Sequence, residues 1–269
     1  MQALLSYGFL QKAFLAGVFI ALACAVLGVF LLLRKDAMIG HGLSHITFAG
    51  VALGLLIQRM PLLVALAFSM GAALGMMKLK ESARLYGDTA IAILSSVGMA
   101  LGIILATIAR NFNVALLNFL FGDILAIEPV EVWFSIGLAG VVVALVIANY
   151  HKFMYMTFDR ESAAVSGINV RRLETLITVL TAVTIVLGMK IVGILLVSAL
   201  VVMPAAAGLQ AAANFKMAMI VSCGTALVSV IGGLLIAYFL DLPASGTIVL
   251  LSFLIFVLFF VYSRRQNKS

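Results

Sequence analysis

The chain is a succession of long apolar segments with almost no charged residues, separated by short polar ones. The segments lie at residues 13–33, 37–57, 62–77, 89–109, 132–148, 173–188, 191–209, 217–240 and 244–262. Each is close to the length of about 20 residues that an α-helix needs to cross the hydrocarbon core of a membrane. We therefore predict an all-α, polytopic transmembrane helix bundle, a single domain over residues 1–269, with eight to nine spans. The count stays open because the residues around Lys190 can instead form one broken helix.

The composition excludes most other classes of protein. Hydrophobic residues make up 65% of the chain and charged residues only 10%, and the mean hydropathy is +1.26. A soluble domain is about half apolar and about a quarter charged. A soluble enzyme, a disordered chain, a collagen and a disulfide scaffold are therefore excluded. The two cysteines, Cys24 and Cys223, lie inside apolar segments, so we interpret them as packed thiols.

The basic residues orient the predicted spans. The net charge is +7, with 17 lysines and arginines, and such residues accumulate on the cytoplasmic side of membrane proteins. With the N-terminus outside, only Lys12, Arg59, Arg110 and Lys190 face outward, and all the other basic residues lie in cytoplasmic loops. This asymmetry predicts a multi-pass cell-membrane protein with a cytoplasmic C-terminus.

Small residues indicate how the spans pack, because close approach of backbones drives helix association in lipid. Three pairs of glycines four residues apart have this spacing: Gly50 and Gly54, Gly71 and Gly75, and Gly98 and Gly102. We expect them to serve packing within one chain rather than a dimer seam.

Two histidines are the clearest candidates for chemistry. His41 and His45 are four residues apart near the start of the second span, so they share one helical face. Two neutral imidazoles placed in this way can bind one ion of zinc, copper, nickel or iron. The alternative is an inert pair that faces an interfacial water pocket. A metalloprotease would need glutamate directly after the first histidine; Gly42 stands there.

The other ionisable residues are weaker candidates. Asp123 lies in a stretch too polar to face lipid, where it can guide a cation at the outer mouth or simply cap a helix. We interpret Glu128 and Glu131 as solvated. His151 stands beside Lys152 in a polar loop, and we expect it to be exposed and without function.

The cytoplasmic loop 150–172 contains a short helix-forming stretch. Asp159 and Glu161 begin it, and the small residues Ala163, Ala164 and Gly167 would allow it to enter a groove on another protein. The alternative is an ordinary connector. Because the chain has no phosphate-binding Gly-rich loop, any use of ATP requires a separate subunit.

Four stretches together resemble the permease subunits of the ABC-3 class of bacterial metal importers. They are residues 39–54, 118–125, 189–207 and 241–246, in the order found in that family. The resemblance implies a homodimer of permeases, two cytoplasmic ABC ATPase subunits and an extracellular metal-binding protein that delivers the substrate. It also implies that residues 159–167 form the coupling segment, which docks into the ATPase.

The resemblance further implies that His45 lies on the metal path. Many relatives have aspartate at the position of His41, and an imidazole there favours zinc over manganese. We therefore expect the permease of an ATP-driven importer that moves a divalent metal ion, with zinc as the first candidate, by alternating access. It would be a transport subunit rather than an enzyme, and it would have no intrinsic cofactor. It would lie in membrane lipid and bind no nucleic acid.

Several rivals stay open. A manganese or iron importer of the same family differs only in cargo. A secondary transporter driven by protons or sodium would normally keep buried carboxylates for the coupling ion, and the predicted spans have few. A membrane enzyme would need a water-activating base near the histidines, and none is adjacent in sequence.

Overall fold

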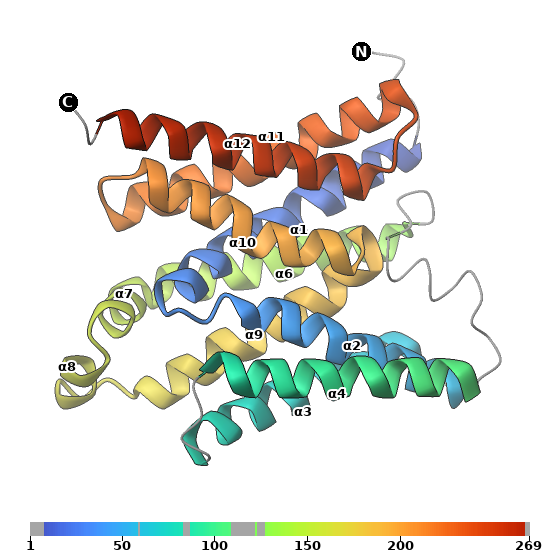
Figure 1. The fold of residues 1–269 in the computed structure, drawn as a ribbon, viewed down its shortest axis with the longest axis horizontal. Helices are drawn as coiled ribbons and strands as arrows, with labels where there is room; N and C mark the ends of the chain where they lie inside the picture. The colour runs from blue at the N-terminus through green and yellow to red at the C-terminus, as the bar shows by residue number, and fades with distance from the viewer. Residues whose placement is uncertain (1–7, 59, 83–86, 109–121, 123–126, 267–269) are drawn as a thin grey trace.

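A computed structural model describes residues 8–58, 60–82, 87–108, 122 and 127–266 (Figure 1). These residues form helices and no strand, which confirms the predicted all-α bundle. The first four helices are α1 (Gly8–Leu33), α2 (Met38–Leu56), α3 (Pro61–Ser82) and α4 (Gly87–Ile108). They are followed by α6 (Pro129–Ala148), α7 (Tyr150–Phe158), α8 (Arg160–Val165) and α9 (Val170–Val192). The last three are α10 (Ile194–Ala211), α11 (Phe215–Leu240) and α12 (Ala244–Gln266).

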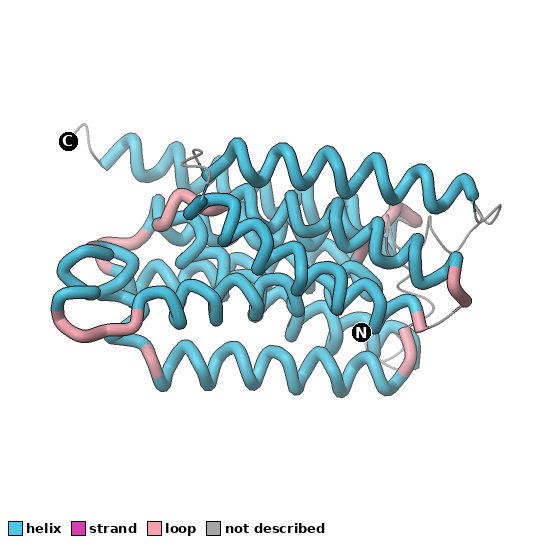
Figure 2. Tube along the Cα trace, turned by 90° about the horizontal axis from the view of Figure 1, so that it is seen from below, coloured by secondary structure: helices cyan, strands magenta, loops and turns pink. Residues whose placement is uncertain are grey.

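Nine helices of the described part are long and apolar enough to cross a membrane. They coincide with the nine predicted apolar segments, although most extend beyond them by several residues. The remaining two, α7 and α8, are short and fill the predicted cytoplasmic loop. Figure 2 shows the long helices running roughly along one axis with the connections at both ends.

A single residue separates α9 from α10. Gly193 has φ 85° and ψ 160°, a conformation that residues with a side chain rarely adopt. Glu174, near the start of α9, contacts Arg34 at the end of α1, and Phe215, just after α10, packs against Phe30 of α1. The start of α9 and the end of α10 therefore lie at the same end of the bundle (Figure 1), so the chain reverses at Gly193 and each helix runs its full length.

The long helices form two packed groups. α2, α3 and α4 contact one another, whereas α1 packs on α6, α10 and α11, and α12 packs on α10 and α11. α9 contacts members of both groups. The short helices α7 and α8 and the end of α12 lie at the end of the bundle opposite to the start of α1 (Figure 1). We call this the α8 end; the predicted orientation makes it cytoplasmic.

Glycines allow the closest approaches within the first group. A Cβ on Gly98 of α4 would lie 2.9 Å from the Cα of Ile46, and one on Gly50 would lie 2.7 Å from the Cα of Ala65 on α3. Gly54 and Gly102 are similarly enclosed. The predicted packing within one chain is therefore confirmed for these two pairs. It is wrong for Gly71 and Gly75, since a Cβ there would have no described atom within 4 Å.

Candidate metal-binding site

The structure brings the two imidazoles of α2 together. The Nε2 atoms of His41 and His45 lie 3.1 Å apart, and their ring centroids are 4.5 Å apart with the planes at 89°. The side chain of His41 is exposed and that of His45 is half-buried. The expectation that residues four apart share one face is therefore met, and the two Nε2 atoms lie within hydrogen-bonding distance of each other.

Neighbouring glycines set where the imidazoles emerge. Gly40 precedes His41 and faces Val201 of α10, whereas Gly42 follows it and faces Ile91 of α4. A Cβ on Gly42 would approach the Cγ2 of Ile91 to 2.6 Å. Because successive residues of a helix are about 100° apart, His41 lies between the sides of α2 that face α10 and α4, on an exposed face of the helix. In Figure 1, α2 lies between these two helices.

A serine between the histidines anchors this part of α2. The Ser44 hydroxyl donates to the carbonyl oxygen of Gly40 at 2.8 Å. Its oxygen also lies 3.1 Å from the hydroxyl of Ser198 on α10. Because Ser44 gives its one hydrogen to Gly40, the Ser198 hydroxyl is the donor between the two serines, and it also lies 3.1 Å from the carbonyl oxygen of Ile194. This chain of hydroxyls fixes the rotation of α2 against α10 and thereby the direction of both imidazoles.

The spacing of the two nitrogens suits one metal ion. Two nitrogens bound to a tetrahedral zinc at the usual bond length stand roughly 3.3 Å apart, close to the 3.1 Å found here. Without an ion, one Nε2 donates its hydrogen to the other, which requires different tautomers of the two rings. Among the described residues, no third His, Cys, Asp or Glu joins the pair. The described part of one chain therefore supplies two of the four ligands that zinc usually takes.

The pair lies near the α8 end of α2. His41 is three residues and His45 seven residues beyond Met38, which corresponds to about 4.5 and 10 Å along the helix axis. The helix has 19 residues, so both imidazoles lie in the half of α2 nearer to α7 and α8.

The predicted coupling residues form a capped turn of helix. Asp159 is the N-cap of α8, and its Oδ1 accepts the N–H of Ser162 at 2.9 Å. Gly167 ends the turn with φ +82° and donates to the carbonyl oxygen of Ala164. Glu161 and Ala164 are exposed, whereas Ala163 is fully buried within the chain. The outward face of α8 therefore includes Ala164 and Val165, which is 90% exposed, beside the charged side chain of Glu161.

The remaining candidates fare differently. Asp123 lies outside the described residues; its neighbour Gly122 packs against the reversal of the chain, where a Cβ would lie 2.5 Å from the carbonyl carbon of Val192. The interpretation of Glu131 as solvated is wrong. Its carboxylate is buried at the start of α6 and pairs with Lys190 of α9. Glu128 and His151 are exposed, as expected.

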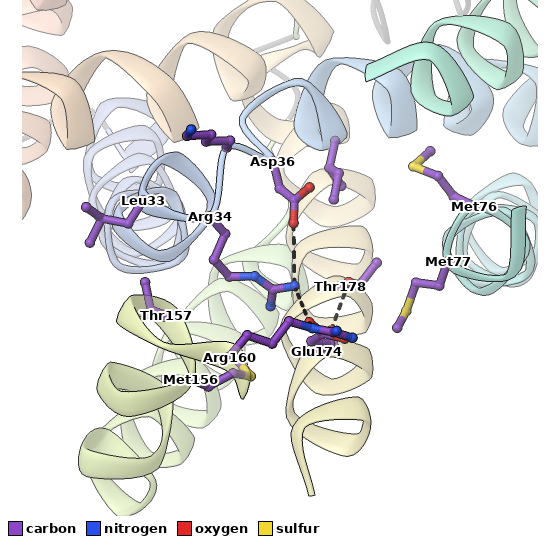
Figure 3. Close-up of a pocket in the computed structure, with 12 residues that line it drawn as sticks. Leu33, Arg34, Asp36, Met76, Met77, Met156, Thr157, Arg160, Glu174 and Thr178 are labelled. Carbon is purple, nitrogen blue, oxygen red and sulfur yellow. Dashed lines mark hydrogen bonds and ion pairs between the residues drawn. The ribbon is translucent and has the colours of Figure 1, made fainter. Parts of the chain in front are cut away.

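A cluster of charges at the α8 end escaped the sequence analysis. Glu174 of α9 is only 9% exposed and pairs with Arg34 and Arg160, and Arg34 also contacts Asp36 (Figure 3). We call these four residues the Glu174 cluster. The sequence signal for this cluster is Glu174 itself, a glutamate at the start of a predicted span, and such a residue is equally compatible with exposure to water.

Comparison with known proteins identifies the family. The sequence profile of the ABC 3 transport family matches residues 6–263. The chain belongs to this family. It is thus a multi-pass membrane component of a transport system, which confirms the resemblance drawn from the sequence and the prediction that it is not an enzyme.

Two curated relatives and one solved structure illustrate the similarity. A manganese transport system membrane protein, MntC of Listeria innocua, is 32% identical over 99% of this chain and 95% of its own. A high-affinity zinc uptake system membrane protein, ZnuB of Haemophilus influenzae, is 34% identical over 93% and 95%. The structure of PsaBC from Streptococcus pneumoniae in complex with Fab superposes with a TM-score of 0.86, 28% identity, and coverage of 96% and 93%.

Proposed function

We propose that this chain is the permease subunit of an ABC importer that moves a divalent metal ion, with zinc as its first substrate. The observation that supports this most directly is the 3.1 Å separation of the His41 and His45 Nε2 atoms on one face of a membrane helix. Imidazoles inside a membrane are costly unless they serve a site or a path. The names of the relatives cited above support a metal as the cargo.

A second copy of the chain would complete the site. His41 is exposed on the surface of the single chain, and an imidazole facing acyl chains would be unfavourable. Zinc usually takes four ligands, whereas the described part of one chain offers two at this place. In a two-fold homodimer joined along this exposed face of α2, each copy would contribute two imidazoles, and the four together suit one zinc ion.

Energy would come from two ATPase subunits bound at the α8 end. Ala164 and Val165 present a small apolar surface there, and Asp159 and Gly167 fix the turn that carries it. The C-terminus would lie on the same, cytoplasmic side, and an extracellular binding protein would deliver the ion at the opposite end. ATP binding and release would move α8 and expose the imidazoles alternately to the two sides of the membrane. Because a transport site must also release its ion, its affinity for the metal would be moderate.

The donor set favours zinc over manganese. Imidazole nitrogens are borderline ligands that suit zinc, whereas manganese prefers carboxylate and carbonyl oxygens. Among the described residues, no carboxylate joins His41 and His45 in a possible metal site. We therefore infer a preference for zinc within a family whose named relatives include both cargoes.

Uptake by cells that depend on this chain tests the proposal. The variants His41→Ala and His45→Ala should each abolish most ATP-dependent zinc uptake, while His151→Ala, a change of the exposed third histidine, should leave it unchanged. Manganese measured in parallel should enter more slowly than zinc in the unaltered protein. Normal zinc uptake by both variants would refute the site, and uptake that continues without ATP would favour a secondary transporter.

A further inference from the structure

Glu174 joins three segments of the chain through one carboxylate. Its Oε1 accepts hydrogen bonds from Arg34 at 3.1 Å and from the Nε of Arg160 at 2.9 Å, and its Oε2 accepts from the Nη2 of Arg160 at 3.3 Å. The side chains of Glu174 and Arg34 are 11% and 16% exposed, so their bond is only weakly screened by water, whereas the side chain of Arg160 is 65% exposed. Figure 3 shows both guanidinium groups converging on Glu174 from different helices.

The two arginines that pair with Glu174 lie in different segments of the chain. Arg160 is the first residue of α8, directly after the Asp159 cap. Arg34 follows the last residue of α1, and its Nη2 also lies 3.5 Å from the Oδ2 of Asp36. The carbonyl oxygen of Asp36 accepts the N–H of Ile39 in the first turn of α2. A continuous set of charged contacts, completed by one backbone hydrogen bond, thus leads from α8 to the beginning of the helix that carries the imidazoles.

The surroundings allow this connection to move. Beside the Glu174 cluster lies a cavity of about 560 Å³, bounded on its far side by Met76 and Met77 of α3 (Figure 3). A densely packed joint would resist displacement, because protein interiors transmit strain and leave few voids. A cavity of this size therefore gives the start of α2 and the end of α3 room to shift relative to α9.

The neighbouring helix α7 is held in another way. Its Phe153 packs on Phe30 of α1 at 5.4 Å, and its Phe158 contacts Phe215 of α11 at 6.0 Å. These apolar contacts fasten α7 to the group of helices around α1. The charged contacts of α8, by contrast, reach toward the other group, in which α2 packs on α3 and α4.

We propose that Glu174 is a positioning residue that transmits displacement of α8 to α2 and so couples ATP hydrolysis to the opening of the imidazole site. When α8 moves, Arg160 pulls on the carboxylate, and Arg34 and Asp36 carry the displacement to the first turn of α2. Because α2 is a continuous helix from Met38 onward, the imidazoles move with that turn. This inference rests on the proposed function, since it requires an ATPase partner at α8.

The test measures zinc ions transported per ATP hydrolysed, using the complete transporter in lipid vesicles. In Glu174→Gln the charge is lost but the shape is kept. The ratio should fall roughly fivefold or more, the range of a coupling free energy above about 1 kcal/mol, while ATP hydrolysis continues. The matched control is Asp241→Asn, which removes a carboxylate from the exposed turn between α11 and α12 and should keep the ratio.

A second variant guards against loss of folding. Arg160→Gln removes the bonds from Arg160 to Glu174 and leaves the pair of Arg34 and Glu174 in place; the ratio of zinc transported to ATP hydrolysed should fall in the same direction. An unchanged ratio in both variants overturns the inference, as does a parallel fall of transport and hydrolysis with a constant ratio, which marks a purely structural role. If the unaltered transporter moves no zinc with ATP, the proposed function fails as well, so the two failures are distinguishable.

Discussion

The hydroxyl oxygens of Ser44 on α2 and Ser198 on α10 lie 3.1 Å apart, and Ser44 directly precedes His45 in the sequence. Hydrogen bonds between membrane helices are worth about 0.6 kcal/mol on average, so this contact orients the helix more than it stabilises the bundle. The contact connects the two groups of helices at the level of His41 and His45, the candidate metal ligands. Its loss should therefore affect the direction of the imidazoles more than the folding of the chain.

A double-mutant cycle on this pair tests that view. Ser44→Ala and Ser198→Ala should each lower thermal stability in detergent only slightly, and their coupling energy should be about 0.6 kcal/mol. Zinc affinity should fall further than stability does, because the imidazoles lose their fixed rotation. Additive effects of the two substitutions on stability would show that the hydroxyls do not interact.

Close packing of α4 on α2 gives a second prediction. Gly98→Ala should destabilise the chain by about 1–3 kcal/mol, the usual cost of overpacking, because the new methyl group would meet the backbone of Ile46. Gly75→Ala on α3 is the control, since it has no described atom within 4 Å and gains helix propensity. Thermal unfolding of the two purified variants checks this, and equal stability would contradict the observed packing.

The reversal between α9 and α10 gives a third prediction. Gly193→Ala should lower stability by about 1–3 kcal/mol, because an L-residue at φ 85° is strained. A helical glycine with open surroundings, Gly137 of α6, provides the control, and Gly137→Ala should be neutral or slightly stabilising. Denaturation followed by tryptophan fluorescence from Trp133 would measure both, and a neutral Gly193→Ala would contradict the described conformation.

The cap of α8 gives a prediction about pH. Hydrogen bonds from Ser162, chiefly from its side chain and then from its backbone, lower the pKa of Asp159. A lowered pKa in the folded state means that the cap is fully formed above the ordinary carboxyl pKa and is lost as pH falls through the lowered value. Amide hydrogen exchange at Ser162 should therefore accelerate in acid beyond its intrinsic pH dependence.

Substitutions at this cap separate charge from hydrogen bonding. In Asp159→Asn the side chain still accepts the Ser162 N–H, so protection should persist in acid, because asparagine caps helices about as well as aspartate. In Asp159→Ala protection should be lost at neutral pH. Binding of the ATPase subunit should weaken in the alanine variant only. Equal protection of Ser162 in all three proteins would show that the cap does not order α8.

The spans could be predicted from the sequence because the membrane restricts the possible structures. An apolar segment of about 20 residues must be helical in lipid, where every backbone N–H and C=O needs a partner within the segment. The same periodicity placed His41 and His45 on one face, and the structure brings them together. Even the cap at Asp159 follows local rules of helix termini.

Contacts between distant segments could not be predicted in this way. Glu131 and Glu174 both appeared as isolated acids near the start of a span, and only the folded chain places Lys190 beside one and Arg34 beside the other. Likewise, the pair of Ser44 and Ser198 depends on which helix neighbours α2. Gly71 and Gly75 have the same spacing as the other two pairs. The local sequence does not show that, in the described part of the chain, no helix packs against them.

The exposed position of His41 has a genetic consequence if the site is shared by two copies. A cell that makes normal and His41-altered chains in equal amounts would assemble them at random, and only about a quarter of the assemblies would hold four intact imidazoles. An allele of this kind would therefore interfere with its normal counterpart instead of being silently complemented by it.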